Sequence, residues 1–576
     1  MLQFGPAVNR PVHELRCYHL QVLESDLQGI GEPPLSDATV LIPAAGRVSE
    51  GLMAFSNVAT PAMIPVAGAP VIHWTLKSLT ELGATRFRIA VPERGLSVED
   101  HAECVFGDVA SFEWVVPNPT GSAGSTVARL LDGVDGPAMS VLGDTLFSFG
   151  AALPDFSRAW VMTSPVEESD RWCIIECDER GRVVSWHNKR AGLAQPLEAA
   201  VGVYWLPHGI DSAEVEALLA RPDPIEISTV IERATGDQPV YGVRAGTWLD
   251  CGNPDTQEAT RRTMLQERTF NQLSFDGVNG TIRKSSTSKE KFIDEVNYLR
   301  LLPDDVSVLF PRVVKDSTEW SDPWVVLEYV GYPTLTELFL FGNLRAAAWM
   351  SIFDRLSTTL ERFREHERPI PVGDLHEMYV GKTRRRLDEC AGLAHLDPLL
   401  HVDDLMINGR RRRPLTALVA EAERHLERLA DNSVGAIVHG DFCFSNILYD
   451  VRTGVCKLID PRGSFGRVGI HGDQRYDVAK LHHSLLGSYD HIVAGLYQFD
   501  LDGRDVRLKV FRTPAQERVC AQYRSQILEH WNTREIDLIT GLIFASLPAM
   551  HTESADRQSA FVVQAIELLS TGLGMD

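Results

Sequence analysis

The sequence predicts an α/β protein of two domains, an N-terminal domain with a mixed, mostly parallel sheet and a C-terminal α+β domain. Three observations predict this. A chain of 576 residues is too long for one hydrophobic core. The apolar pattern Thr39 to Pro43 runs into the small residues Ala44-Ala45-Gly46 and then a helical pattern, as in α/β folds. Residues 437–466 place short apolar strands around polar loops, among long helical patterns.

The composition limits the partners. Apolar residues make up 44% and charged residues 23%, an ordinary globular balance. The net charge of −22 argues against nucleic acid or an anionic membrane as a main partner. No apolar run is long enough to span a bilayer, and the N-terminus lacks a signal-peptide core. The nine cysteines show no metal-type pairing. We therefore expect a cytoplasmic protein that binds small molecules and nucleotides, and a homo-oligomer is left open.

The first domain is expected over residues 37–267, after an N-terminal arm over 1–36. A strand that enters a small-residue turn and then a helix is how α/β folds hold phosphates. Further motifs follow in a fixed order: the loop and helix of Pro61 to Ala84, NPTGSAGSTVARLL at Asn118 to Leu131, SVLGDTLF at Ser140 to Phe147, and TWLDCGNPDTQEA at Thr247 to Ala259.

This motif order resembles the sugar-phosphate nucleotidylyltransferases over about Thr39 to Leu265. The resemblance implies a GT-A or Rossmann-like fold, Mg²⁺, and a nucleoside triphosphate (NTP) whose base the sequence leaves open. The residues it implies are Gly46, Arg47, Gly121, Ser122 and Gly124 for the nucleotide, Asp144 and Asp250 for Mg²⁺, and Lys189 for the acceptor phosphate. Carboxylates at strand ends suit a reaction that builds charge on phosphate oxygens.

Two positions depart from the pattern of that family. Glu50 stands where an arginine that grips triphosphate is expected, and a glutamate there would repel the phosphates. Ala62 follows Pro61 where the family has a lysine, and Arg47 is the neighbouring cation that could substitute. One alternative is therefore a degenerate domain that serves as a ligand sensor or scaffold, because a fold match does not establish activity.

The second domain is expected over residues 268–576 and carries a spacing that suits phosphoryl transfer. His439 precedes Asp441 by two residues, Asn446 follows by five, and Asp460 ends a short apolar strand. In such loops one Asp accepts the proton of the substrate hydroxyl, while an Asn and a second Asp hold Mg²⁺. The alternative is a strand-loop-strand hairpin with incidental carboxylates.

The His-Gly-Asp triplet resembles the aminoglycoside phosphotransferase and choline kinase family of small-molecule kinases. Asp460-Pro461-Arg462-Gly463 replaces the usual Asp-Phe-Gly. The resemblance implies a protein-kinase-like domain that uses ATP and Mg²⁺, with an N-lobe at about 268–332 and a C-lobe at about 333–576.

Four further residues fit such a domain. Lys284, placed after a strand, is the candidate for the lysine that contacts phosphate, and Glu295 on the next helix is its candidate partner. Arg283 and Lys289 compete for the lysine's role. The apolar strand WVVLEY ends in Glu328 and Tyr329, as expected of a hinge that meets adenine through backbone groups.

Two arginine runs, 384–386 and 410–413, either receive an anionic substrate or form solvated faces, and the second interpretation is favoured.

The fusion suggests consecutive reactions. A kinase domain would phosphorylate a sugar-like alcohol, and a nucleotidylyltransferase domain would join the sugar phosphate to a nucleotide for surface glycan synthesis. Three alternatives stay open: an active kinase with a degenerate first domain, a choline kinase with phosphocholine cytidylyltransferase activity, and antibiotic phosphorylation. A non-catalytic scaffold is disfavoured because Asp441, Asn446 and Asp460 are retained together.

Overall fold

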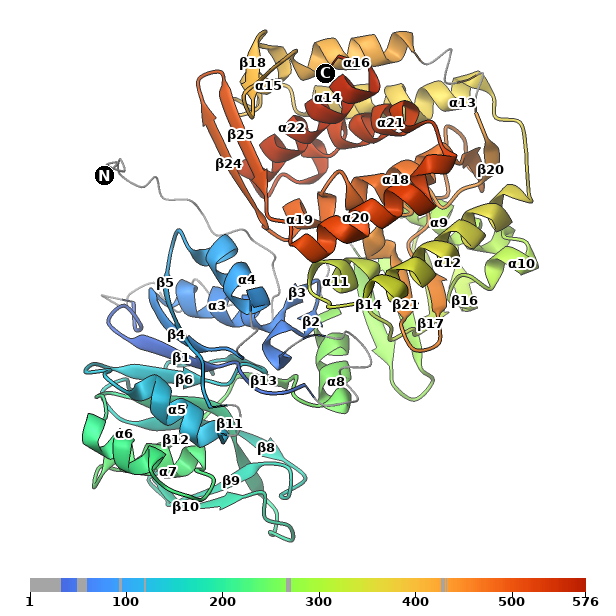
Figure 1. Ribbon diagram of the computed structural model, residues 1–576. Helices are drawn as coiled ribbons and strands as arrows, with labels where there is room; N and C mark the ends of the chain where they lie inside the picture. The colour runs from blue at the N-terminus through green and yellow to red at the C-terminus, as the bar shows by residue number, and fades with distance from the viewer. Residues whose placement is uncertain are drawn as a thin grey trace.

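The computed structural model describes residues 33–48, 58, 60–92, 96–118, 121–265, 271–425, 430 and 433–575. Figure 1 shows the N-terminal part at the lower left and the C-terminal part at the upper right, with helix α8 (Pro254–Leu265) between them. The arm and the predicted boundary at 267 fall mostly or wholly outside the described residues.

A nine-stranded mixed sheet forms the centre of the described N-terminal part. Strands β1 (Thr39–Pro43), β4 (Arg86–Ala90), β5 (Ser111–Val115) and β6 (Ala138–Val141) are its parallel section, in the order β6-β1-β4-β5. The other strands are β8 (Trp160–Val166), β9 (Cys173–Cys177), β10 (Val183–Asn188), β11 (Leu197–Leu206) and β12 (Tyr241–Arg244). Strand β11 pairs antiparallel with β6, β8 and β9. The predicted mixed α/β architecture of this part is confirmed.

Helices cover both faces of this sheet, because successive side chains of a strand point to opposite faces. Val40 and Ile42 of β1 pack in one apolar cluster with α3 (Val71–Glu81) and α4 (Leu96–Phe106), whereas Leu41 packs in another with Val127 of α5 (Ala123–Leu131). Helices α6 (Ser212–Leu219) and α7 (Ile227–Thr235) complete the second face. Smaller elements lie at the sheet edge: η1 (Pro61–Met63), β2 (Pro65–Val66), β3 (Ala69–Pro70), β7 (Thr145–Ser148) and β13 (Thr247–Asp250).

The C-terminal part begins with a four-stranded sheet in the order β14-β15-β17-β16. Its strands are β14 (Asn271–Asp276), β15 (Thr281–Ser286), β16 (Val313–Ser317) and β17 (Trp324–Glu328). Helix α9 (Lys289–Leu301) packs on it through Phe292 and Val296 against Val325. Lys284 lies inside β15 and not after a strand, so that part of the prediction was wrong.

A larger, mainly helical region follows. Helix α18 (Arg475–Leu485) is buried along its length and packs against α21 (Thr533–Ala545), which packs against α22 (Ala555–Gly572). The remaining helices are α10 (Asp304–Ser307), α11 (Leu335–Leu340), α12 (Ala346–Arg364), α13 (Val372–His376), η2 (Glu377–Gly381), α14 (Lys382–Glu389), α15 (Asp397–His401), α16 (Leu415–Arg424), η3 (Phe444–Asn446), α19 (Tyr489–Val493), α20 (Pro514–Gln526), η4 (Leu528–His530) and η5 (Pro548–Met550).

Short strand pairs interrupt these helices. They are β20 (Gly435–Ile437) with β23 (His471–Asp473), and β21 (Ile447–Asp450) with β22 (Val455–Leu458). A second four-stranded sheet contains β18 (Leu405–Ile407), β19 (Arg410–Arg412), β24 (Tyr497–Asp502) and β25 (Asp505–Val510). Within the described ranges, no helix combines the length and apolar character needed to cross a bilayer.

Helix α8 joins the two parts through a buried ion pair. Arg261 donates to Glu337 at 3.2 Å and to the carbonyl of Tyr332, and both charged side chains are at most one-tenth exposed. Arg262, one residue on, lies over the rings of Phe275 and Tyr329. The contact between the two parts is thus packed and charged.

Candidate active sites

The loop at Asp441 is held by a buried carboxylate from α18. Asp477 accepts the backbone N–H groups of His439 at 2.7 Å and of Gly440 at 2.8 Å. Gly440 has φ +76°, and a Cβ there would lie 2.2 Å from the ring of Phe465, so glycine is required by both conformation and space. These contacts fix the backbone that presents Asp441.

Asp441 is bound on both carboxylate oxygens. Lys480 of α18 donates to Oδ1 at 2.8 Å, and the amide of Asn446 donates to Oδ2 at 3.0 Å. Burial alone would raise the pKa of Asp441, but the Lys480 ammonium and the Arg462 guanidinium hold that pKa well below its usual range. The carboxylate is therefore ionised near neutral pH and can orient a hydroxyl group and accept its proton.

Lys284 of β15 contacts Asp460, which follows β22. The Lys284 ammonium donates to Asp460 at 2.8 Å and to Glu295 of α9 at 2.7 Å. Burial would lower the pKa of Lys284, but the two carboxylates raise it, so the side chain stays charged. The competitors point elsewhere, since Arg283 pairs with Asp322 and Lys289 donates to a backbone carbonyl.

The donor atoms near Asp460 suit Mg²⁺. The backbone N–H of Ile459 donates to the carbonyl of Asn446 at 3.0 Å, which places Asn446 and Asp460 side by side. Asn446 spends its amide N–H groups on Asp441, and its Oδ1 accepts no hydrogen bond from a described residue. Mg²⁺ usually takes one or two protein oxygens and completes its shell with water and phosphate oxygens. In the described residues, no group of three His, Cys, Asp or Glu gathers as a protein-only metal cage.

The expected adenine contact at Glu328 and Tyr329 is not available through their amides. The N–H of Glu328 donates to the carbonyl of Arg312 at 3.0 Å, and that of Tyr329 donates to Gly280 at 2.9 Å. The side chain of Glu328 pairs with Lys457. Both amides already serve the sheet, so the sequence could not show which hinge groups remain for a base.

In the N-terminal part, the candidate nucleotide loop follows β1 at the carboxyl edge of the parallel strands. Gly46 and Arg47 are exposed there, and a Cβ on Gly46 would lie 3.9 Å from Pro61. Gly143, at the end of β6, approaches Ala44 so closely that a Cβ would lie 3.0 Å from its Cα. Ligands of open α/β sheets bind at this edge.

Asp144 and Asp250 lie together at the same edge. The antiparallel pair β7–β13 sets Asp250 opposite Thr145, and a Cβ on Gly252 would lie 2.6 Å from Asp144 Oδ2 and 3.5 Å from Asp250 Oδ1. Burial, and then the Asp250 charge, raises the pKa of Asp144 to about 6. Two half-buried carboxylates that repel each other are the donor set that a divalent cation stabilises.

The other residues predicted to contact the nucleotide fall into two groups: Ser122 and Gly124 pack within the protein, whereas Gly121 is exposed. Ser122 caps α5 by accepting Ser125 N–H, and its hydroxyl also donates to Ile225 O at 2.7 Å. A Cβ on Gly124 would lie 2.3 Å from that same carbonyl, so these two residues pack α5 against the start of α7. Gly121 is exposed at the turn before the helix.

Lys189 is exposed just after β10 with φ +48°, and its backbone N–H donates to Trp172 O. Trp172 packs edge-on against Trp248, which lies two residues before Asp250. The segment of Lys189 therefore adjoins the strand of Asp250.

Of the two positions that depart from the family pattern, the structure describes only Ala62. Ala62 is fully buried in η1. Because its side chain is an uncharged methyl group, this position supplies no cation to the edge of the sheet. Glu50 lies outside the described residues.

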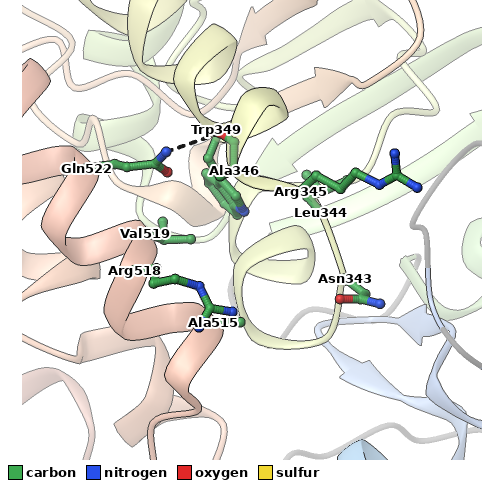
Figure 2. A pocket seen from close by; sticks show the side chains of 9 residues that line it. All are labelled: Asn343, Leu344, Arg345, Ala346, Trp349, Ala515, Arg518, Val519 and Gln522. Atoms are coloured by element: carbon green, nitrogen blue, oxygen red, sulfur yellow. Dashed lines mark hydrogen bonds between the residues drawn. The ribbon is translucent and has the colours of Figure 1, made fainter. Parts of the chain in front are cut away.

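A recess of about 480 Å³ lies between α12 and α20 (Figure 2). Trp349 and Arg518 line it, and Gln522 donates to the carbonyl of Ala346 across it at 3.2 Å. It contains none of the predicted site residues.

Sequence reasoning missed Lys480, Tyr476, Lys382 and Arg462 beside Asp441. Tyr476 and Lys480 lie one helical turn apart on α18, three and seven residues after Asp473. No local motif marks them, because their role depends on the packing of α18 against a loop more than thirty residues away.

Similarity to known proteins is found over part of the chain. The chain is 27% identical over 191 residues to bifunctional protein GlmU of Pelobacter propionicus, which is 30% of this chain. The chain spans 39% of the length of that relative. No protein-family model matches the chain.

Solved structures give similar matches. A UDP-glucose pyrophosphorylase complexed with UDP-glucose is 19% identical with a TM-score of 0.34, and covers 40% of this chain and 99% of its own. The inositol-1-phosphate CTP transferase from T. maritima is 14% identical with a TM-score of 0.34, and covers 40% of this chain and 96% of its own.

Proposed function

We propose that the chain is a bifunctional enzyme. The C-terminal part transfers the terminal phosphoryl group of ATP to a sugar-like alcohol, and the N-terminal part transfers a nucleotidyl group to the resulting sugar phosphate. The product would be a nucleoside-diphosphate sugar for surface glycan synthesis. The observation that carries the first step is the meeting of Lys284, Asp460 and Asn446 beside the ionised carboxylate of Asp441.

These residues account for the bonds and the proton of the phosphoryl transfer. The acceptor oxygen forms a bond to the γ-phosphorus as the bond from that phosphorus to the ADP oxygen breaks, and the hydroxyl proton passes to Asp441. Mg²⁺ bound by Asn446 and Asp460 would supply charge neutralisation for the phosphates. Lys284, held by Glu295, is placed to contact phosphate oxygens once it exchanges Asp460 for the nucleotide.

The nucleotidyl step uses the edge of the large sheet. Asp144 and Asp250 would hold Mg²⁺, and the loop at Gly46 and Arg47 would contact the triphosphate. An oxygen of the sugar phosphate forms a bond to the α-phosphorus of the NTP, and the bond to pyrophosphate breaks. The similarity to GlmU over 191 residues supports this assignment.

A second candidate keeps only the kinase active, with the N-terminal part as a nucleotide sensor. The burial of Ala62 favours it, because the phosphate-binding lysine expected after Pro61 has no replacement at that position. Purified full-length chain with Mg²⁺ separates the two candidates. ADP release with ATP and a panel of sugars and polyols reports the first reaction. Pyrophosphate release with each NTP and a panel of sugar 1-phosphates reports the second. ADP release without pyrophosphate release from any acceptor would favour the sensor.

A further inference from the structure

Four cationic side chains gather near Asp441. Lys382 and Arg386 lie one helical turn apart on α14, Arg462 follows β22, and Lys480 lies on α18. Among them, Lys480 is engaged by Asp441. The others have a different partner.

Lys382 and Arg462 converge on one phenol oxygen. The Lys382 ammonium lies 2.7 Å from Tyr476 Oη, and the Arg462 guanidinium donates to the same oxygen at 3.0 Å. Tyr476 is 1% exposed and lies one turn before Lys480 on α18. The phenol thus connects Lys382 and Arg462 to the helix that carries Lys480, the partner of Asp441.

Three of the four cations in this cluster have no carboxylate partner among the described residues. Within the described ranges, Lys382, Arg386 and Arg462 form no ion pair with Asp or Glu, and Arg386 instead donates to Ser546. The neighbouring Arg384 and Arg385 show the contrast, since they are exposed and pair with glutamates. Asp477, on the same helix as Tyr476, is already engaged by two backbone amides of the Asp441 loop.

The titration of the cluster shows the excess of positive charge. Burial would raise the pKa of Tyr476, but Arg462 and Lys382 lower it to about 7. Burial, together with Arg462, lowers the pKa of Lys382 to about 7. Half-buried cations that lack a carboxylate partner are costly, and an incoming anion removes that cost.

We propose that the alcohol phosphorylated in the C-terminal part carries an anionic group, a carboxylate or a phosphate, which Lys382, Arg386 and Arg462 bind while its hydroxyl lies at Asp441. This inference rests on the proposed phosphotransferase function. It excludes a cationic acceptor such as a quaternary ammonium alcohol, which would need an open aromatic face. The ring of Tyr476 is covered by the protein's own cations, with Lys382 at 4.9 Å and Arg462 at 5.8 Å from its centroid.

The kinetic test uses acceptors matched except for charge, such as glucose against glucuronate and glucose 6-phosphate, with full-length chain, ATP and Mg²⁺. We expect the anionic member of a pair to be phosphorylated with the higher kcat/KM. Lys382→Met should raise the KM for that acceptor about 10- to 100-fold, as the loss of a charge-assisted hydrogen bond does, and leave the KM for ATP within about twofold. Arg386→Gln is a second variant in case Lys382→Met folds poorly, and Arg385→Gln on the exposed face of α14 is the matched control. A preference for neutral acceptors, or a variant effect on the KM for ATP alone, would overturn the inference while keeping the kinase.

A binding test does not depend on turnover. Inorganic phosphate, compared with chloride at equal ionic strength, should raise the Tm of the wild type and of Arg385→Gln more than that of Lys382→Met. Equal shifts in all three proteins would overturn the inference. If the shifts differ as expected but no acceptor yields ADP, the anion site stands and the kinase assignment fails.

Discussion

Lys480 donates to Asp441 Oδ1 at 2.8 Å from a side chain that is itself 7% exposed. The two residues are 39 positions apart and belong to α18 and to the loop after β20. The pair joins two elements that Asp477 already links through backbone amides, so one face of α18 both supports the loop and sets the charge of its carboxylate.

Removal of the Lys480 charge should change the pH dependence of phosphoryl transfer. Lys480 favours the ionised form of Asp441 and lowers its pKa, so Lys480→Met should raise that pKa. The acid limb of the kcat/KM profile should then move to higher pH, and activity in weakly acidic buffer should fall more than activity at pH 8. Arg385→Gln is the control, and an unchanged acid limb would show that Lys480 does not set the charge of Asp441.

The lysine that bridges Asp460 and Glu295 should be needed for turnover with ATP. Lys284→Met removes the cation while it preserves much of the side-chain volume in a buried site. We expect kcat to fall at least about 10²-fold, the scale of losing one preorganised charge contact. Lys289→Met tests a nearby, half-buried lysine and should retain activity. A wild-type kcat in Lys284→Met would remove this residue from the phosphate site.

Metal binding by the N-terminal part should weaken in acid. The pKa of Asp144 is raised to about 6, so the carboxylate is protonated below that pH and ionised above it. Protons and Mg²⁺ compete for the ionised form, and the apparent affinity for Mg²⁺ should fall as the pH drops from 7 to 5. Pyrophosphate release measured against Mg²⁺ concentration at each pH reports this. A metal requirement that does not vary over this range would argue against Asp144 as a ligand.

Gly252 should be essential for the same site because of space. A methyl group there would lie 2.6 Å from Asp144 Oδ2. Gly252→Ala should therefore displace a carboxylate and abolish Mg²⁺-dependent nucleotidyl transfer while the chain stays folded by circular dichroism. Gly150→Ala is the matched control, because its nearest atom would be an ordinary 3.6 Å away. Full pyrophosphate release by Gly252→Ala would contradict this placement.

The ion pair between α8 and the C-terminal part should contribute to stability. Arg261→Met leaves Glu337 as a buried, uncompensated carboxylate, and the loss of one partner of such a pair costs about 3 kcal/mol. A lower midpoint of urea unfolding is expected. Arg261→Met combined with Glu337→Gln should recover part of the loss, and Arg233→Met, at an exposed pair, should change little.

Sequence patterns predicted the local features well and the non-local ones poorly. The apolar run Thr39 to Pro43 predicted β1, and the spacing from Asp441 to Asp460 brought together residues that the structure places side by side. Both signals lie within a few tens of residues. The hairpin β24–β25 was missed although Asp502-Gly503 is a turn signal between alternating stretches.

The basic cluster at Tyr476 could not be predicted from the sequence. Its members come from segments about ninety residues apart, and the run 384–386 predicted only a charged face. The structure divides that run, with Arg384 and Arg385 in exposed ion pairs and Arg386 directed to Ser546. Helical phase explains the division, since residues four apart, Lys382 and Arg386, share a face.

The most direct measurement follows isotope-labelled γ-phosphate from ATP to an acceptor, with wild type and Asp441→Asn compared at saturating Mg²⁺. Wild type should yield labelled phosphate ester in proportion to ADP. Asp441→Asn should yield almost none, while its N-terminal part still binds nucleotide. Equal label transfer by both proteins, or none by wild type across anionic and neutral alcohols, would contradict phosphoryl transfer at Asp441.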